Sequence, residues 1–542
     1  EYSSKQLLTG TAFPLNMDKD ADDGMNGSSL TIKGSFNEAG QQDFSNPTVI
    51  SSYPGVATER LMNITTNGEP VSIEGIMFNN ATANGNGIVS TGDNLTLARV
   101  AFRGNAGTGL STSGNSLIYN ALFADGGTGL NVGSGDVKVV NATFANNSTA
   151  AITGTASVFN SVSWKSGSGV SEGNNNAVLT AENDDIQNGP NFVDPSNENI
   201  LLRDYRIRPS MMLLNKGNND NYPGDLTTDV DLTSGKRLVD GTIDIGAYEY
   251  AAPLSQILYV KSGVVGSDES GASWTNAISD LQGAIDLASI YANANSGKTG
   301  YVFVHNNVSA NNVRVAMPGV KAYGSMNDET GTDVTDILGK RSSLLDMERR
   351  SKINGLTVGG AGSVVDGFEV SGTVAVSDGM LSTSIVKPTD AVTVTGNGVL
   401  YNSFVEGSVN GKAVNVTATG TITGNGGGNN NSEAKENGYV SVDCWKYQLK
   451  DDSGLFDKAK EETITAYMEM AGHSKDLSGS IRVRNGFVDF GCFETWNITA
   501  DTEISATDKP TRNHVVYVRN GAELKSAKLL PLGKKKIQRC HD

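Results

Sequence analysis

Five short segments end on an aromatic residue at nearly constant spacing: Glu74-Gly-Ile-Met-Phe78, Ala98-Arg-Val-Ala-Phe102, Tyr119-Asn-Ala-Leu-Phe123, Val140-Asn-Ala-Thr-Phe144 and Asn160-Ser-Val-Ser-Trp164. The aromatic residues lie 24, 21, 21 and 20 positions apart, and Gly, Asn, Ser and Thr turns separate the β-rich runs between them. None of these runs has helical spacing. Strand-rich repeats of this length are typical of a solenoid, in which each coil buries its apolar face by stacking on the next. The sequence therefore predicts an all-β, right-handed parallel β-helix whose rings, Trp164 included, form one internal column.

The composition agrees with a thin, turn-rich solenoid. The chain has 542 residues with 64 glycines, and only 7% of its residues are aromatic. Its formal net charge of −17 argues against nucleic acid or an anionic membrane as partner. No apolar run approaches the roughly 20 residues that a membrane-spanning helix needs. Three cysteines are too few for a disulfide scaffold and do not have zinc-ligand spacing.

Landmarks of the first half of the chain return in the second half. Asp231-Leu-Thr-Ser-Gly235 reappears as Asp476-Leu-Ser-Gly-Ser480, and Asp244-Ile-Gly-Ala-Tyr-Glu249 as Asp489-Phe-Gly-Cys-Phe-Glu494, in both cases 245 residues later. Ile73-Glu-Gly-Ile76 reappears 292 residues later, so the offset shrinks along the ladder by about two coils. We therefore predict two tandem β-helix modules, the second shorter than the first.

The predicted boundaries follow from these landmarks. The first module spans 1–252 and has an irregular closing region at 189–252. The second module spans 253–497 with its closing region at 439–497, and 498–542 is the start of a further unit or a tail. The second module opens with a strand and an amphipathic helix near 275–290, which we expect to cap its first coil. The first module has no such opening, so we expect the chain to be a segment of a longer protein.

Several of these segments resemble a known family. Tyr259-Val260, Gly271-Ala-Ser-Trp-Thr-Asn-Ala277 and Leu281-Gln-Gly-Ala-Ile285 resemble the opening of bacterial right-handed β-helix proteins of the pectate-lyase-like superfamily. Phe192-Val-Asp-Pro195, Asp204-Tyr-Arg-Ile207 and the segment from Asp244 to Glu249 are similar to the closing region of Bacteroidota surface proteins of the choice-of-anchor Q type. The resemblance implies a secreted, surface-attached protein. It does not imply one activity, because the family includes adhesins, surface-layer-like proteins and carbohydrate-active enzymes.

The expected function is a structural or adhesive, non-enzymatic role at the outer surface of a bacterial cell. One alternative is a polysaccharide lyase or glycoside hydrolase with a site on its loops, and another is a calcium-stabilised glycan-binding module. The expected partners are other surface proteins or host or surface glycans, with self-assembly or membership of a larger surface complex as further options. Neither nucleic acid nor a membrane span is expected.

The register of the repeat favours the non-enzymatic hypothesis. Enzymes of this kind use carboxylates on neighbouring coils, and glycosidases place two of them within about 10 Å of each other. The residues two positions after each ring are Gly104, Asp125, Asn146 and Ser166, and no column of the ladder contains two stacked carboxylates. We predict no catalytic residue. Asn120 and Asn141 instead predict an amide ladder, in which each side chain bonds its neighbour.

Asp18, Asp20 and Asp22 are candidate ligands of a weakly bound Ca²⁺, the only cofactor that the sequence suggests. Their alternate spacing resembles the front half of a calcium loop. The glycine comes one place late and no glutamate closes the loop, so an EF-hand is excluded and a solvated acidic loop is the alternative. Asp231 recurs in both closing regions and is expected to cap a turn.

Two pairs of residues in the second closing region complete the candidates. Trp445 and Trp496 are candidate sugar-stacking rings, with packing as the alternative. Alignment of the closing regions puts Cys444 in the place of Leu202 and Cys492 in the place of Ala247. Two apolar positions that both become cysteine predict a Cys444–Cys492 disulfide, with two separately buried thiols as the alternative.

Overall fold

The computed structural model describes the following residues: 15–18, 29–39, 42–44, 47–52, 59–80, 82–179, 184–200, 202–328, 334, 337, 350–424, 432–433, 449, 455, 459–460, 465–477, 481–483, 487–494, 496–498, 502–504, 516–518 and 524–526. The chain divides into two compact units, Glu1–Pro253 and Leu254–Asp542. We call them unit 1 and unit 2 and describe each by itself.

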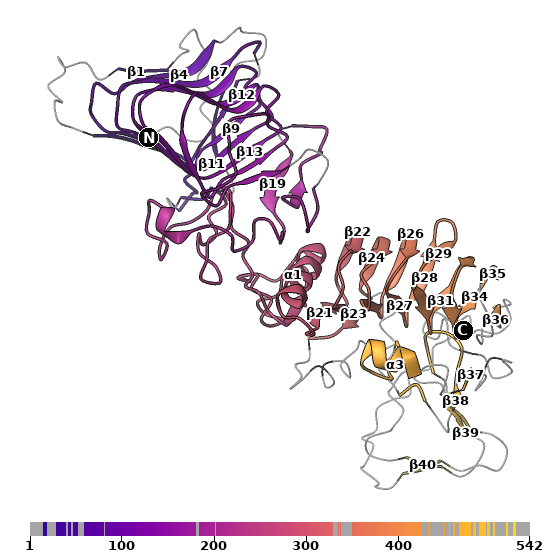
Figure 1. Ribbon diagram of the computed structural model, residues 1–542. Helices are drawn as coiled ribbons and strands as arrows, with labels where there is room; N and C mark the ends of the chain where they lie inside the picture. Colours follow the sequence, from indigo (N-terminus) through magenta and orange to yellow (C-terminus); the bar gives the residue numbers. More distant parts are fainter. Residues whose placement is uncertain are drawn as a thin grey trace. The chain divides into compact units, whose positions relative to one another are not determined.

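Unit 1 is a parallel β-helix in which each coil adds one rung to two long sheets (Figure 1). Within the described residues the first sheet has six strands, in the order β1 (Leu15–Asp18), β4 (Arg60–Thr65), β7 (Asn86–Thr91), β10 (Thr108–Ser113), β12 (Thr128–Ser134) and β14 (Ala150–Thr153). The path of the second sheet is β2 (Leu30–Lys33), β5 (Val71–Glu74), β8 (Leu95–Ala98), β11 (Ser116–Ala124), β13 (Val137–Ala145), β16 (Val162–Trp164) and β17 (Ala177–Leu179). Strands β3 (Thr48–Ser51), β6 (Ile76–Asn79), β9 (Ala101–Arg103) and β15 (Ser157–Phe159) pair beside this path. The parallel coils confirm the predicted fold class.

The internal column of rings runs through four coils. Phe78, Phe102, Phe123 and Phe144 stack with ring centroids 5.3, 5.0 and 4.9 Å apart, and all four are buried. This spacing follows from the distance of about 4.8 Å between neighbouring strands. The prediction that Trp164 continues the column is wrong. Phe144 aligns with Ser163, so Trp164 aligns with Ala145 on the opposite face of the strand.

A second column marks the corner of the coil. Arg99, Asn120, Asn141 and Asn160 all have left-handed backbone, with φ between 49° and 51°. Asparagine tolerates this conformation better than other residues with a side chain, which explains its repetition at the corner.

The amide ladder between Asn120 and Asn141 is a wrong prediction. The amide of Asn120 donates to the Tyr222 hydroxyl at 2.7 Å, and that of Asn141 donates to the Asp244 carbonyl at 2.9 Å. An amide-to-amide bond joins Asn160 to Asn141 instead, at 3.3 Å. The corner points away from the core, so its side chains reach the closing region.

The closing region of unit 1 covers the outer face of the second sheet. It contains the antiparallel pair β18 (Phe192–Asp194) and β19 (Asp204–Ile207) and the 3-10 turn η1 (Asn219–Asn221). Its apolar residues Phe192, Tyr205, Ile207, Leu213 and Ile245 pack on outward-facing residues of the coils such as Leu122, Ala145 and Trp164. Trp164 meets Phe192 edge to face at 5.6 Å, so the displaced ring anchors the closing region.

Unit 2 repeats this plan after an opening helix (Figure 1). One sheet has the order β20 (Ile257–Val260), β21 (Gly300–His305), β23 (Val320–Met326), β25 (Val364–Asp366), β27 (Met380–Ser382), β30 (Val399–Tyr401) and β33 (Ala413–Val414). The other contains β22 (Ser309–Val315), β24 (Lys352–Val358), β26 (Glu369–Val376), β28 (Ile385–Pro388), β29 (Val392–Val394), β31 (Phe404–Val405), β32 (Val409–Asn410), β34 (Thr417–Ala418), β35 (Ile422–Thr423) and β36 (Ser432–Glu433).

The remaining described elements of unit 2 are α3 (Thr465–Ala471) and three short pairs of strands. The pair β37 (Ala459–Lys460) and β38 (Phe487–Val488) is antiparallel. The pairs β39 (Trp496–Ile498) with β41 (Val516–Val518), and β40 (Thr502–Ile504) with β42 (Leu524–Ser526), are parallel.

The predicted cap helix is present as α1, Leu281–Ala294, and lies against β20 to β23. It begins a few residues later than expected because the Asp280 side chain accepts a hydrogen bond from the Gln282 backbone and caps the first turn. Leu281, Ile285 and Ala288 are buried, as their spacing predicts. Neither described helix combines the length and the hydropathy needed to cross a membrane.

Candidate functional site

A groove of about 490 Å³ lies in unit 1, where the coils meet the closing region. Its coil side follows one outward-facing row of the second sheet, in which Met77 aligns with Ala101 and Ala101 with Leu122. Period-two alternation puts these residues on the outer face of the sheet, because Phe78, Phe102 and Phe123 point inward. Leu202 and Tyr248 of the closing region form much of the opposite wall. The floor of the groove is therefore apolar.

Four arginines line the same groove: Arg99, Arg103, Arg203 and Arg206. Arg99 and Arg103 come from the coils, and Arg203 and Arg206 come from the closing region. The only carboxylate among the described lining residues is Asp204. A cationic lining is unusual in a chain whose net charge is −17.

Glu74 positions the first arginine from behind. Its Oε1 accepts a hydrogen bond from Arg99 Nε at 3.0 Å, and its Oε2 lies 3.0 Å from Lys33 Nζ. Burial alone would raise the pKa of Glu74, but the hydrogen bonds and charges of Arg99 and Lys33 outweigh burial and lower it. Arg99 is the one charged residue in the corner column that continues with Asn120, Asn141 and Asn160.

Asp125 positions two more arginines. It accepts hydrogen bonds from Arg203 Nη1 at 2.5 Å and from the Tyr205 hydroxyl at 2.7 Å, and Arg103 Nη2 lies 3.8 Å from its other oxygen. Arg103 also donates to the carbonyls of Ile200 and Arg203. Burial and the negative charge of Asp125 raise the pKa of Tyr205, so this phenol stays a hydrogen-bond donor. The guanidinium groups are held in place before any ligand arrives.

The rim of the groove carries an exposed ion pair. Asp204 and Arg206 are alternate residues of β19, so both side chains point away from the core that Tyr205 enters. Arg206 Nε and Nη2 donate to the two oxygens of Asp204 at 3.0 and 2.5 Å. The Arg206 side chain is 57% exposed, and this planar pair is therefore accessible from solvent.

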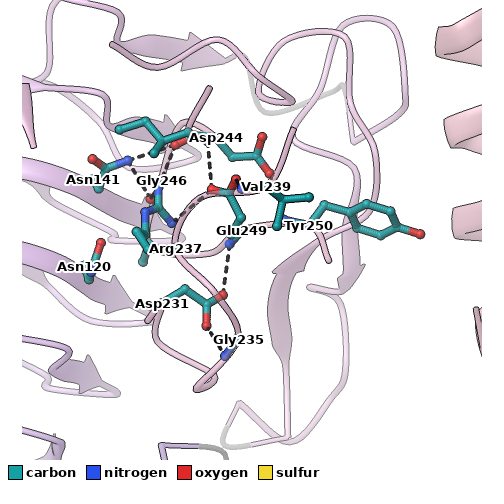
Figure 2. A network of polar contacts seen from close by, with 12 residues as sticks. Asn120, Asn141, Asp231, Gly235, Arg237, Val239, Asp244, Gly246, Glu249 and Tyr250 are labelled. Carbon is teal, nitrogen blue, oxygen red and sulfur yellow. Dashed lines mark hydrogen bonds and ion pairs between the residues drawn. The ribbon is translucent and has the colours of Figure 1, made fainter. Parts of the chain in front are cut away.

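A buried polar network fixes the closing region of unit 1 (Figure 2). The Arg237 guanidinium donates to the carbonyls of Asp244 and Gly246, at 2.7 and 3.1 Å. The two oxygens of Glu249 accept hydrogen bonds from the backbone of Val239 and of Asp244, at 3.0 and 2.9 Å. This network joins the turns of the closing region to one another. Its side chains have almost no contact with solvent.

Asp231 belongs to the same network and acts as the predicted turn cap. Its Oδ1 accepts hydrogen bonds from the backbone of Thr233 and Gly235, and its Oδ2 accepts one from the backbone of Glu249 (Figure 2). Unit 2 repeats the arrangement 245 residues later. Arg482 donates to the Gly491 carbonyl, Glu494 accepts from the backbone of Asp489, and Asp476 accepts from the backbone of Glu494. A pattern present in both units is part of the scaffold rather than a site specific to one of them.

The carboxylates of this network outnumber the cation that faces them. Burial and the charge of Asp244 raise the pKa of Glu249 to about 9, and burial raises that of Asp244 to about 6. In unit 2, burial and the charge of Asp489 likewise raise the pKa of Glu494, the counterpart of Glu249. Burial and the neighbouring carboxylate thus favour the protonated form of Glu249.

None of the other predicted site residues is among the described residues that line the groove. Asp18 ends β1, and Asp20, Asp22, Cys444 and Trp445 lie outside the described residues, as does the Trp496 side chain. Cys492 is buried and is a free cysteine in this structure. The pairing with Cys444 and the calcium site thus stay predictions. No group of three metal-ligating side chains occurs within the described part of the chain.

Sequence reasoning missed the groove. Its main residues come from segments about 100 positions apart, such as Arg103 and the Arg203 carbonyl that it contacts. One signal in the sequence points to the groove, because Arg99 interrupts a series of corner asparagines and Asp204-Tyr-Arg-Ile207 is a landmark of the closing region.

The fold and the site define a class: a parallel β-helix protein with a lateral, arginine-lined groove under its closing region. No protein-family model matches the chain, and no curated protein matches its sequence. Among solved structures, one described as the crystal structure of pectate lyase Pel9A matches with 11% identity over 86% of each chain and a TM-score of 0.18. With so low a TM-score, the assignment to the β-helix class rests on the strand register of this chain.

Proposed function

We propose that the chain is an extracellular protein of a bacterial cell surface with a structural and adhesive role, and that the groove of unit 1 holds its ligand. The observation that carries the proposal is the combination of an apolar floor with positioned guanidinium groups, which is typical of binding sites for small polar molecules. The stacked coils supply a rigid support for such a site. The extracellular location is supported by the sequence resemblance to surface proteins.

The composition of the groove favours binding over hydrolysis. A glycosidase needs an acid and a second carboxylate on either side of the scissile bond. The groove presents Asp204 alone among its described lining residues, and Arg206 occupies both oxygens of that carboxylate. A polysaccharide-degrading activity is the second candidate function, and it would require a site elsewhere on the loops.

The proposal is tested by retention of glycans on the immobilised full chain. We expect a subset of an array of neutral and acidic glycans to bind, without release of new reducing ends during incubation. Leu202→Asp should abolish this retention, because Leu202 is 65% exposed and forms part of the apolar wall.

Val265→Asp is the matched control, since Val265 is 99% exposed and belongs to unit 2. Retention that is equal in wild type and Leu202→Asp would contradict the proposal, as would a wild-type chain that retains no glycan. New reducing ends would favour the enzymatic alternative.

A further inference from the structure

Tyr248 carries the one hydroxyl of the described groove lining that has no hydrogen-bond partner within the protein. The residue is buried, with 8% of its surface exposed. Its hydroxyl is not one of the described side-chain oxygens that are both unbonded and fully enclosed. The exposure that remains therefore includes the hydroxyl, which opens into the groove.

The other polar side chains of the described lining are already bonded inside the protein. Ser35 donates to the Gly75 carbonyl, Thr233 donates to the Asp231 carboxylate, and Tyr205 donates to Asp125. Each lining arginine lies beside a carboxylate, which is Glu74 for Arg99, Asp125 for Arg103 and Arg203, and Asp204 for Arg206. A ligand that enters the groove therefore meets Tyr248 as the hydroxyl whose hydrogen bond is still to be made.

The surroundings of this hydroxyl decide what it can bind. Burial raises the pKa of Tyr248, so the phenol stays protonated and can donate. Tyr248 belongs to the same apolar cluster as Ala101 and Leu122, and Met77 packs against that cluster. A ligand group that reached this place without an acceptor would displace water and leave a buried donor unbonded, which is costly. The group that fits combines an acceptor oxygen with an apolar surface.

We infer that the groove takes a glycan unit with an N-acetyl group, whose carbonyl oxygen accepts a hydrogen bond from the Tyr248 hydroxyl; this inference rests on the proposed function. An acetamido group keeps its N–H beside the sugar ring and presents a methyl group and a carbonyl oxygen at its tip. The methyl group suits the apolar row of Met77 and Leu122. A sugar hydroxyl also accepts hydrogen bonds, but it brings a donor of its own to side chains that cannot bond it.

The experiment compares matched probes that differ in this one group. We would titrate the full chain by calorimetry with N,N′-diacetylchitobiose and cellobiose, which share linkage and ring configuration. Methyl N-acetylgalactosaminide and methyl galactoside form a second pair. At least one N-acetylated probe should bind about tenfold or more tightly than its hydroxyl partner, since a site that bonds one ligand group discriminates against analogues without it.

Removal of a single oxygen tests the role of the hydroxyl. Tyr248→Phe should weaken the preferred N-acetylated probe about tenfold and leave its hydroxyl partner nearly unchanged, so the ratio of the two affinities falls. The thermal stability should stay the same, because this hydroxyl has no partner within the protein to lose. Tyr291→Phe makes the same chemical change on α1 of unit 2 and should leave the ratio of affinities unaltered.

The outcomes separate this inference from the proposed function. If the hydroxyl probes bind as tightly as the N-acetylated ones, the groove is a glycan site but the N-acetyl class is wrong. If the chain retains array glycans while neither N-acetylated probe binds at millimolar concentration, the inference fails alone. An affinity ratio that Tyr248→Phe leaves unchanged would also overturn it.

Discussion

The guanidinium of Arg237 lies 3.8 Å from the carboxylate of Glu249, and neither side chain is more than 1% exposed. Arg237 uses its hydrogen bonds on backbone carbonyls rather than on this carboxylate. Glu249 in turn uses both oxygens on backbone N–H groups. The two side chains thus organise turns of the closing region instead of neutralising each other directly.

Replacing Glu249 by glutamine should loosen the closing region of unit 1. The amide nitrogen cannot accept a hydrogen bond, so one of the two buried N–H groups of Val239 and Asp244 loses its partner, at a cost of about 1–3 kcal/mol. Hydrogen exchange of peptides from 231–250 measures this opening free energy. Glu198→Gln, at an exposed position, is the control and should leave exchange unchanged.

The stability of the same region should fall as the pH rises. The pKa of Glu249 is about 9 in the folded protein against an ordinary value of 4.5, so between these values the folded state binds more protons than the unfolded state. Stability then decreases with increasing pH across this window. We expect faster exchange of peptides from 231–250 at pH 9 than at pH 6, after correction for the intrinsic rate. The difference in opening free energy between wild type and Glu249→Gln should become smaller over the same pH interval. A difference that stays constant would contradict the raised pKa of Glu249.

Phe123→Ala should strongly destabilise the coils of unit 1. Phe123 is fully buried between Phe102 and Phe144, and removal of a core phenylalanine costs about 3–5 kcal/mol. Urea unfolding followed by exchange of β11 and β13 peptides measures the loss. Phe36→Ala is the matched control, since that ring is 50% exposed, and an equal loss in the two variants would refute the internal column.

Trp164→Ala should act on the closing region rather than on the column. Trp164 is buried against Phe192 on the outer face of the sheet. Its removal leaves a cavity under the closing region. We expect faster exchange in β18 and β19 with little change in β11. Trp164→Phe retains an aromatic contact and should recover much of the protection. Loss of protection in β11 that equals the loss in β18 would contradict the outward position of this ring.

The repeated coils and closing regions were predictable from the sequence. The face of the strand on which an individual side chain lies was not. Phe78 to Phe144 recur at a spacing that specifies stacked coils, and Asp231 and Asp476 reveal the duplicated closing region. Trp164 looks like a further member of the series because aromatic identity does not record which face of a strand it occupies.

The groove was not predictable because it depends on which residues the closing region covers. Asp125 meets Arg203 and Tyr205 only after the closing region has folded back along the outer face. Nothing in the local sequence of Asp125 distinguishes it from a corner residue such as Asn146, which has the same left-handed backbone. The one departure in the column of corner asparagines is Arg99, which is a local sign of a special role.

The corner asparagines have a consequence for the length of the two units. In unit 1 the backbone N–H of Gly246 binds the carbonyl of Asn160, and in unit 2 that of Gly491 binds the carbonyl of Asn415, each a left-handed residue of a late coil. In both units this joint therefore ties the closing region to a late coil of the ladder. Insertion or deletion of earlier coils would leave this hydrogen bond possible, but it would shift contacts such as that of Arg103 with the Ile200 carbonyl. The number of coils can therefore differ between the two units while the hydrogen bond between the last corner asparagine and the closing region stays the same.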